Sequence, residues 1–379
     1  MNILIAPDSF KECLTAKEVA KSIAKGVKIA LPNADIVQIP LSDGGEGLLD
    51  ALVQPMQGKL ISLDVKDPLL RTIKAEYGIS DDGTTAIVEM ATASGLELLS
   101  EEEKNPLVTS SFGVGQLILD ALNRGCSKII IGLGGSATND GGVGMIKALG
   151  GNFLDVNNEE IGEGGGAISE LHRIDLSDLN PKIGECKFIA ACDVSNPLTG
   201  ENGASLVFGT QKGGATEDLK RLDSNLLHYA TILNSHLGID VNSIKGAGAA
   251  GGLGAALFSI LGAKMRSGID LIIDYLHLEK QIQNSDLVIT GEGKIDSQTL
   301  YGKTIMGVAK IASKHNVPVV AIAGKIDNDI DEIYKKGITA VFSVTNQPMN
   351  LEDSISGADN LIKQCVGNVM RVFKLNQFK

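Results

Sequence analysis

The sequence has no tryptophan, and aromatic residues make up only 4% of its 379 residues. So few flat side chains argue against a platform that stacks the bases of a single-stranded nucleic acid. Proline is also scarce, with 10 residues, which excludes a collagen-like chain or a proline-rich linker. Lysine and arginine total 34 against 46 aspartates and glutamates, and the net charge of −12 argues against a general nucleic-acid or anionic-membrane surface.

Disulfide, zinc and membrane signals are missing too. The five cysteines include no CxxC pair and are odd in number, so we expect reduced thiols in a cytoplasmic protein. The first seven residues have no basic segment and too short an apolar run for a secretory signal. Residues 246–263 carry no charge, but their first half is nearly all glycine and alanine. We therefore predict a glycine loop that leads into a buried helix, not a membrane span.

Short apolar segments alternate with helical patterns, most clearly near the two chain ends. We predict strands at residues 2–6, 35–40, 286–290, 317–323 and 339–344, and helices after Thr15-x-x-Glu18 and over 307–314, 331–336 and 355–373. This order is typical of a parallel sheet covered on both faces. The fold class is thus α/β. Residues 1–65 and 280–379 are expected to form one Rossmann-like or flavodoxin-like domain, with a mixed α/β domain, residues 66–279, inserted into it.

Acidic and glycine-rich loops follow several of the predicted strands. They contain Asp8; Asp43 and Glu46; residues 136–140; Asp193 and Asn196; and Glu292 and Asp296. The carboxyl ends of strands are where open α/β sheets bind ligands. A single acid in such a loop is more often a turn or helix-cap residue. Five loops of the same chemistry favour a ligand site.

Two glycine loops, residues 134–142 and 246–254, can bring backbone N–H groups close to a phosphate. In the first, hydroxyl, amide and carboxylate side chains stand among the glycines, which suits a phosphate with its Mg²⁺. The alternative is a tight strand–helix turn. Gly246-x-Gly248-x-x-Gly251 fits the dinucleotide fingerprint but follows no clear strand. A Walker A motif fails because Ser297 replaces its first glycine, and the protein-kinase and GxSxG motifs are missing.

Six blocks of the sequence resemble the type I glycerate kinases, in that family's order. They are residues 5–11, 42–47, 134–142, 193–198, 246–254 and 290–296, the last followed by Gln298-Thr299 and Gly302-Lys303. Residues 11–13 and 41–43 depart slightly from the family's usual pattern. The resemblance implies a two-domain α/β enzyme with its active site in the cleft between the domains. It implies transfer of the γ-phosphoryl group of ATP to D-glycerate with Mg²⁺, and bacterial members of this type mostly give 2-phosphoglycerate.

The resemblance, together with the chemistry of phosphoryl transfer, suggests roles for individual residues. Asp193 is our choice for the general base, Asp296 is its competitor, and Lys11 is a further catalytic candidate. Substrate-binding candidates are Asp8, Ser9, Arg71, Gly134, Gly135, Ser136, Thr138, Asn139, Asp140 and Asn196. Cofactor-binding candidates are Gly246, Gly248, Gly251, Gly252 and Lys303, and metal candidates are Asp43, Glu46 and Glu292. In the alternative interpretation, the acids only cap loops and orient the backbone.

Two other functions are weighed against the kinase. A nicotinamide-dependent 2-hydroxy-acid dehydrogenase would use the fingerprint at Gly246, and a non-catalytic sugar-acid-binding protein would bind substrate without turnover. The residues alone leave open which hydroxyl is phosphorylated, which glycine loop binds ATP, and whether the chain forms a homo-oligomer. We expect small-molecule partners only, with no nucleic acid and no membrane.

Overall fold

The computed structural model describes the chain except for residues 11–12, 43–46, 297–298, 301–303 and 376–379. The chain divides into two compact units. Unit 1 consists of Met1–Asp43 and Ile269–Lys379, and unit 2 of Gly44–Gly268. A unit formed by both chain ends is the arrangement that the strand pattern predicts. The units separate at residues 43/44 and 268/269, whereas we expected boundaries near 65 and 280.

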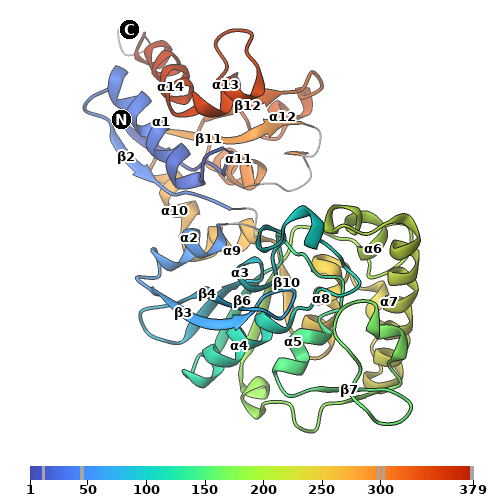
Figure 1. Cartoon of the computed structure of the whole chain (residues 1–379). Helices are drawn as coiled ribbons and strands as arrows, with labels where there is room; N and C mark the ends of the chain where they lie inside the picture. The colour runs from blue at the N-terminus through green and yellow to red at the C-terminus, as the bar shows by residue number, and fades with distance from the viewer. Residues whose placement is uncertain (11–12, 43–46, 297–298, 301–303, 376–379) are drawn as a thin grey trace. The chain divides into compact units, whose positions relative to one another are not determined.

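Unit 1 is built on a five-stranded sheet in which all neighbouring strands are parallel (Figure 1). The N-terminal strand lies in its interior, between β2 and β11, where Ile3 pairs with Leu287. The apolar residues of β1 and β11 are buried, as expected for a parallel sheet covered on both faces. In sheet order the strands are β13 (Ala340–Ser343), β12 (Val319–Ile326), β11 (Leu287–Ile295), β1 (Asn2–Ile5) and β2 (Asp35–Gln38).

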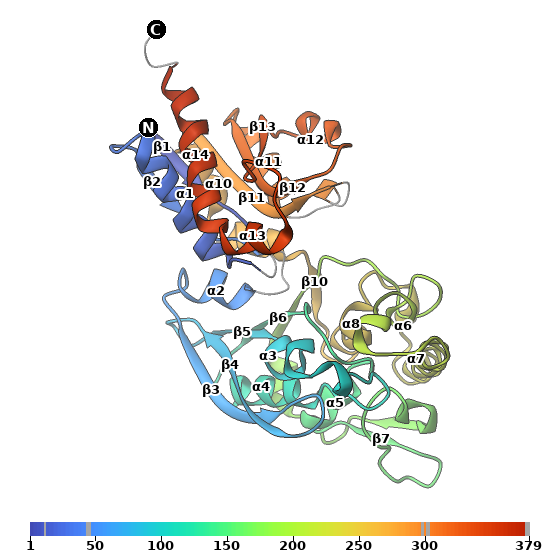
Figure 2. The same cartoon turned by 45° about the horizontal axis from the view of Figure 1, so that its top comes forward.

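Two long helices from opposite ends of the chain, α1 (Ala16–Ala30) and α14 (Ala358–Leu375), lie side by side (Figures 1 and 2). Their apolar faces share a core with the sheet. The predicted capping box at the start of α1 is confirmed, because Thr15 Oγ1 accepts the Glu18 N–H and Glu18 accepts the Thr15 N–H. The helix predicted over 355–373 is two helices in the structure, and Gly357 separates them. The other helices are α9 (Gly268–Tyr275), α10 (Leu278–Gln283), α11 (Thr304–Lys314), α12 (Asp331–Lys335) and α13 (Leu351–Ser356).

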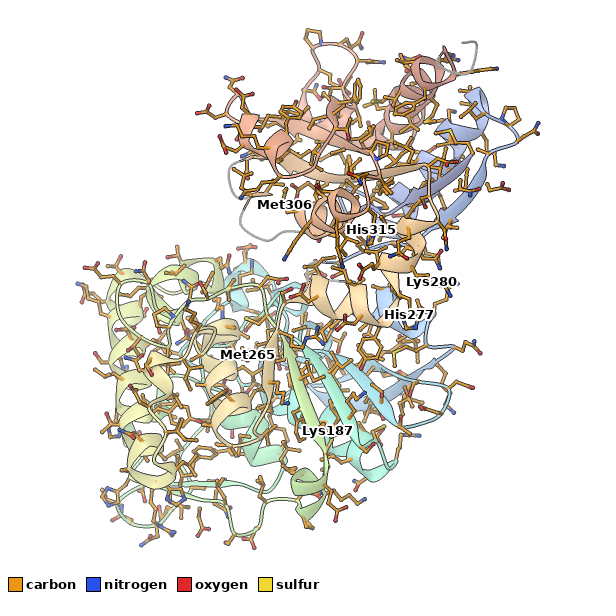
Figure 3. All side chains as sticks on the ribbon, turned by 180° about the vertical axis from the view of Figure 1, so that it is seen from behind. Lys187, Met265, His277, Lys280, Met306 and His315 are labelled. Atoms are coloured by element: carbon orange, nitrogen blue, oxygen red, sulfur yellow. The ribbon has the colours of Figure 1, made fainter. Side chains whose placement is uncertain are left out.

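Helices α10 and α11 are joined by one acidic side chain. Glu279 of α10 accepts a hydrogen bond from Lys314 at 2.6 Å and lies 2.8 Å from Nε2 of His315. His315, directly after the end of α11, and Lys280 on α10 are labelled in Figure 3. These contacts explain His315 as a residue that packs α11 against α10.

Unit 2 contains a six-stranded mixed sheet. Its β3–β4 and β4–β5 pairs are antiparallel and the others are parallel. Because β3 pairs with β4 over its whole length, the segment before residue 66 belongs to this unit and not to unit 1. In sheet order the strands are β10 (Lys264–Arg266), β9 (Lys187–Ala191), β6 (Lys128–Gly132), β5 (Thr85–Glu89), β4 (Thr72–Ile79) and β3 (Lys59–Lys66). A separate hairpin pairs β7 (Asn152–Leu154) with β8 (Arg173–Asp175).

Helices cover both faces of this sheet. Neighbouring residues of β4 show this: Tyr77 donates a hydrogen bond to Asp120 of α4, while Gly78 lies against Val53 of α2. The helices are α2 (Leu48–Val53), α3 (Ala91–Ser94), α4 (Phe112–Asn123), α5 (Val143–Ala148), α6 (Ala204–Phe208), α7 (Thr216–Leu237) and α8 (Ala249–Ser259). Short 3₁₀ turns lie at Leu96–Leu98, Glu101–Glu103, Ala167–Glu170, Pro181–Glu185, Thr210–Lys212 and Val241–Ser243.

The expectations about a membrane span and about the cysteines can be compared with the described residues. Within them, no helix combines the length and apolarity that a membrane crossing requires. The segment that raised this question, residues 246–263, contains the buried turn before α8 and the whole of that helix, in agreement with the predicted glycine loop and buried helix. All five cysteines are free thiols.

Candidate functional site

Asp8 lies just beyond β1, at the carboxyl edge of the unit 1 sheet. Its N–H donates to the Gly291 carbonyl at 2.8 Å, which continues the pairing of β1 with β11. Its carboxylate accepts the Ser9 N–H at 2.6 Å and the Thr304 hydroxyl at 2.5 Å, and the residue is 8% exposed. The strand end therefore holds a buried, oriented carboxylate at the place where the sequence predicted one.

Two further predicted acids lie on β11 and just after it. Glu292, 7% exposed, accepts the Thr299 hydroxyl at 2.6 Å. The same hydroxyl oxygen accepts the Asp296 N–H at 3.1 Å, so one threonine ties both acids to the loop. The Asp296 carboxylate lies 2.9 Å from Lys294, which also pairs with Asp327 at 3.0 Å. Asp8, Glu292 and Asp296 thus belong to neighbouring strand ends of one sheet.

The donor chemistry at this edge suits Mg²⁺, which prefers hard carboxylate oxygens. Among the described residues, no group of three or more acids, histidines or cysteines converges on one point. Two of the metal candidates, Asp43 and Glu46, lie outside the described residues, as do the catalytic candidate Lys11 and the cofactor candidate Lys303.

In unit 2, the loop of residues 134–142 follows β6 and runs from the surface into the core. Gly135 is exposed and Gly134 half-buried, whereas the rest of the loop is buried. The loop is paired with the segment before it: Leu96 donates to the Gly135 carbonyl at 2.8 Å, and Ala137 to the Ser94 carbonyl at 2.9 Å. The part of this loop that a ligand can reach is therefore the Gly134–Gly135 pair. Three of the substrate candidates, Thr138, Asn139 and Asp140, are fully buried.

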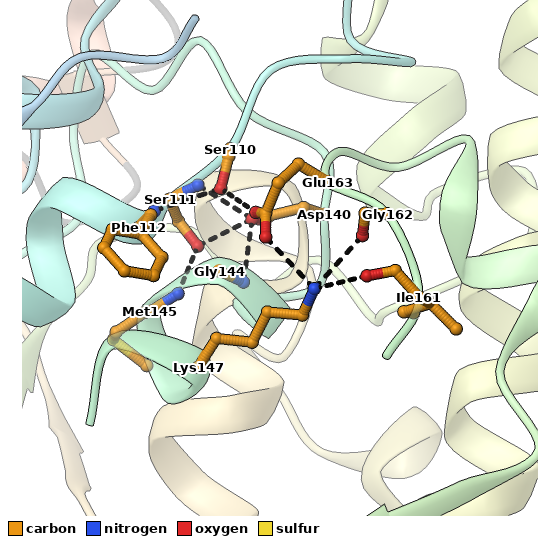
Figure 4. Close-up of polar contacts among 10 residues, drawn as sticks. All are labelled: Ser110, Ser111, Phe112, Asp140, Gly144, Met145, Lys147, Ile161, Gly162 and Glu163. Carbon is orange, nitrogen blue, oxygen red and sulfur yellow. Dashed lines mark hydrogen bonds and ion pairs between the residues drawn. The ribbon is translucent and has the colours of Figure 1, made fainter. Parts of the chain in front are cut away.

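Asp140 holds the base of this loop (Figure 4). Its carboxylate accepts the Ser111 N–H at 2.8 Å, the Ser111 hydroxyl at 2.7 Å and the Gly144 N–H at 3.2 Å. It also accepts the Gly142 N–H at 3.2 Å. Burial raises the pKa of Asp140, and these hydrogen bonds oppose the rise. All of these contacts lie inside the protein, so they support a scaffolding role. Direct contact of Asp140 with substrate stays a prediction.

A second set of polar contacts lies next to Asp140 (Figure 4). Ser110, next to Ser111, donates to Glu163 at 2.6 Å. Lys147 of α5 lies 3.0 Å from Glu163 and donates to the Ile161 carbonyl at 2.6 Å. One network therefore joins the start of α4, the glycine loop and the loop around residue 163. No sequence motif indicated it, because its members are far apart in the chain.

Asp193 and Asn196 lie in the loop after β9, the strand beside β6. Asp193 is exposed, and its Oδ1 accepts the Gly268 N–H at 3.2 Å. The Asn196 side chain donates to the Asn202 carbonyl at 2.9 Å and so shapes its own loop. Asp193 is thus an oriented carboxylate that a solute can reach, which a general base requires.

The second glycine loop, residues 246–254, is buried and packs against both of these loops. The Gly251 carbonyl accepts the Gly141 N–H at 3.0 Å, and the Gly248 N–H donates to the Asn196 carbonyl at 3.1 Å. Three successive residues, 250–252, have positive φ. A Cβ on Gly251 would lie 1.9 Å from the Thr138 carbonyl oxygen. Close backbone packing explains these glycines, and binding of a cofactor by Gly246, Gly248, Gly251 and Gly252 stays a prediction.

The dinucleotide fingerprint lacks its structural context. The segment before Gly246 is the 3₁₀ turn Val241–Ser243, not a strand. A Rossmann fingerprint opens a helix directly after a strand, with its glycines facing the pyrophosphate. The structure therefore gives the dehydrogenase hypothesis no support.

Arg71 lies in the turn between β3 and β4 and is held by two acids. Its guanidinium pairs with Asp67 and Glu103, each at 2.5 Å, and also donates to the Leu98 carbonyl at 3.3 Å. In the described structure, none of its hydrogen bonds reaches the glycine loops. These contacts explain Arg71 as a brace between two surface turns, and a substrate role for it stays a prediction.

The sequence analysis missed one charged residue, Lys212. It ends the 3₁₀ turn Thr210–Lys212 and is only 2% exposed. Its ammonium donates to the Thr138 carbonyl at 2.6 Å and to the Ser136 hydroxyl at 3.3 Å, directly behind the first glycine loop. In the sequence, the only feature that could have drawn attention to Lys212 is its position just before Gly213-Gly214. No known motif matches that arrangement.

Lys212 predicts a specific pH dependence of stability. Burial lowers the pKa of Lys212 to about 7, and the charge of Asp140 opposes this shift. Between this value and the unfolded pKa near 10.4, the unfolded chain binds more protons than the folded one, so the free energy of unfolding rises with pH. We expect the wild type to gain about 2 kcal/mol relative to Lys212→Met between pH 7 and pH 9. Urea unfolding of both proteins at the two pH values measures it, and equal pH dependences would contradict it.

The comparisons with known proteins agree with one another. The model of the glycerate kinase family matches residues 3–374. A glycerate kinase of Halalkalibacterium halodurans is 48% identical over 99% of both chains, and the glycerate 2-kinase of Escherichia coli is 50% identical over 96% of both. A crystal structure described as glycerate kinase 2 from Salmonella typhimurium LT2 is 46% identical, covers 100% of both chains and superposes with a TM-score of 0.89.

Proposed function

Because the chain belongs to the glycerate kinase family, we propose that it transfers the γ-phosphoryl group of ATP to a hydroxyl group of D-glycerate. Membership makes the chain a kinase, that is, a phosphotransferase. The observation that carries the finer proposal is the exposed, oriented carboxylate of Asp193 beside two glycine-rich loops. Phosphoryl transfer depends mainly on positioning and charge neutralisation, and a carboxylate in this place supplies a base for the acceptor hydroxyl.

In the proposed reaction, the hydroxyl oxygen of D-glycerate attacks the γ-phosphorus of ATP. The bond between that phosphorus and the bridging oxygen of ADP breaks, and the hydroxyl proton passes to the carboxylate of Asp193. Asp193 is reachable because it is exposed, and the N–H of Gly268 helps to orient its carboxylate by donating to Oδ1. Asp296 is the alternative base, and its carboxylate is already paired with Lys294.

Two other groups of residues have supporting roles in the proposal. Bound Mg²⁺ would neutralise phosphate charge, and Asp8 and Glu292 have the donor atoms to hold it, with Asp43 and Glu46 as further candidates. The Gly134–Gly135 pair, in which Gly135 is exposed, would bind an anionic group of ATP or of D-glycerate through its backbone N–H groups.

We propose 2-phosphoglycerate as the product. The support is the 50% identity to the glycerate 2-kinase of Escherichia coli.

A ³¹P NMR assay with ATP, Mg²⁺ and D-glycerate tests activity and product together. We expect ADP and 2-phosphoglycerate, and no reaction with L-glycerate as the matched control. Formation of 3-phosphoglycerate would contradict the position of transfer but keep the substrate. Folded protein that forms neither product would overturn the choice of substrate, and binding of D-glycerate without ATP turnover would favour the binding-protein alternative.

A further inference from the structure

The turn at residues 134–136, in which Gly135 is exposed, has backbone N–H groups that the described chain does not use. Among the described residues, the N–H groups of Gly134, Gly135 and Ser136 donate to no acceptor. Gly135 has a φ of +68°, a left-handed conformation that helps successive N–H groups point to one side. Such a concave set of N–H groups binds anions.

Lys212 lies buried immediately behind this turn. Its ammonium donates to Ser136 Oγ at 3.3 Å and to the Thr138 carbonyl at 2.6 Å. Ser136 Oγ in turn accepts the Thr138 N–H at 3.2 Å. The Lys212 ammonium therefore connects residues 136 and 138 through hydrogen bonds. These contacts fix the end of the turn whose backbone N–H groups are unused.

Folding alone does not account for a charge in this place. An ammonium loses its hydration when it is buried, and a neutral side chain of similar volume avoids that penalty. The third N–H of the Lys212 ammonium finds no acceptor among the described residues. Two other buried atoms near the loop, Asn139 Oδ1 and the Tyr229 hydroxyl, also have no hydrogen-bond partner in the described structure. The region thus contains more polar groups than the folded chain uses.

We propose that Lys212 is the positioning residue that orients residues 134–136 for the anionic group of a ligand, a carboxylate or a phosphate. It acts through Ser136 and Thr138 and adds a positive charge behind the N–H groups without touching the ligand. This inference rests on the proposed function, since it takes residues 134–136 as part of the substrate site.

The charge balance around Lys212 is consistent with this role. Asp140 is the charged group whose field acts on the ammonium, and it already accepts hydrogen bonds from Ser111, Gly142 and Gly144. Asp140 therefore compensates the buried ammonium only in part. A ligand anion at the turn would supply the missing negative charge and favour the charged form of Lys212.

Lys212→Met tests the proposal because methionine has a similar volume and no charge. We expect kcat/KM for D-glycerate to fall at least 100-fold while the melting temperature stays equal or rises. Burial lowers the pKa of Lys212 to about 7. We therefore also expect a fall of wild-type kcat/KM above that pH, which the residual activity of the variant does not show. A purely structural lysine would not move this pH profile.

Lys147→Met is the matched control. Lys147 is also a buried lysine, with 5% of its side chain exposed, but it pairs with Glu163 and lies outside the proposed site. We expect a lower melting temperature and a kcat/KM within threefold of the wild type. If Lys212→Met also stays within threefold, or if its activity falls only in step with its folded fraction, the proposal is overturned.

Amide hydrogen exchange separates this inference from the proposed function. The N–H groups of Leu96, Ala137 and Thr138 are hydrogen-bonded to or within the turn. They should exchange at least tenfold faster in Lys212→Met and at wild-type rates in Lys147→Met. If the wild type does not phosphorylate D-glycerate, the proposed function fails. Unchanged exchange at the three amides overturns the role of Lys212 in either case.

Discussion

Asp193→Asn is expected to lower kcat by about 10³-fold with little change in stability, because loss of a general base costs about 10²–10⁴ in rate. The amide oxygen of asparagine can still accept the Gly268 N–H, which lies 3.2 Å from Asp193 Oδ1. The loop should therefore keep its shape while the group that takes the hydroxyl proton is lost. Steady-state assays of ADP formation, with circular dichroism to confirm folding, measure both parts of the expectation.

Two variants make this test specific. Asp155→Asn is the control, since Asp155 caps the turn directly after β7 through the Asn157 and Glu159 N–H groups and should leave kcat unchanged. Asp296→Asn tests the competing base. We expect about a tenfold loss there, because Asp296 is already paired with Lys294 and helps to order the loop after β11. A loss of about 10³-fold for Asp296→Asn with an active Asp193→Asn would assign the base to Asp296.

Gly251→Ala is expected to lower the free energy of unfolding by at least about 3 kcal/mol. Two costs combine. Gly251 has a φ of +66°, which costs an alanine about 1–2 kcal/mol. The new Cβ would also lie 1.9 Å from the Thr138 carbonyl oxygen, and a backbone atom cannot move aside as a flexible side chain can. Overpacking of this kind typically costs about 1–3 kcal/mol.

Gly262→Ala separates the two costs. Gly262 has a φ of +64°, but a Cβ there would meet nothing within 4 Å. We expect this control to lose only about 1 kcal/mol. Urea unfolding of both variants gives the difference, which measures the close approach of residue 251 to the first glycine loop. Equal losses would mean that the two loops are not packed as tightly as described.

Local patterns were sufficient wherever neighbouring residues decide the structure. The Thr15–Glu18 capping box forms as predicted, and the apolar segments near both chain ends form one parallel sheet. The predictions of boundaries were less accurate. Residues up to 65 were grouped with the N-terminal strands, but the pairing of β3 with β4 places Lys59–Lys66 in unit 2. Pairing between strands is a property of two segments, so one segment alone does not show it.

By itself, the sequence determined the α/β class, the split of unit 1 between the two chain ends, and the family, because these depend on periodicity and on contiguous motifs. Only the tertiary structure decided which parts of those motifs face solvent. It exposes Gly135 and Asp193 but buries Asp140 and the loop of residues 246–254, and it places Lys212 behind the first glycine loop. Burial and long-range hydrogen bonding depend on which segments meet in space, and residues as distant as 138 and 212 meet only once the whole unit has folded.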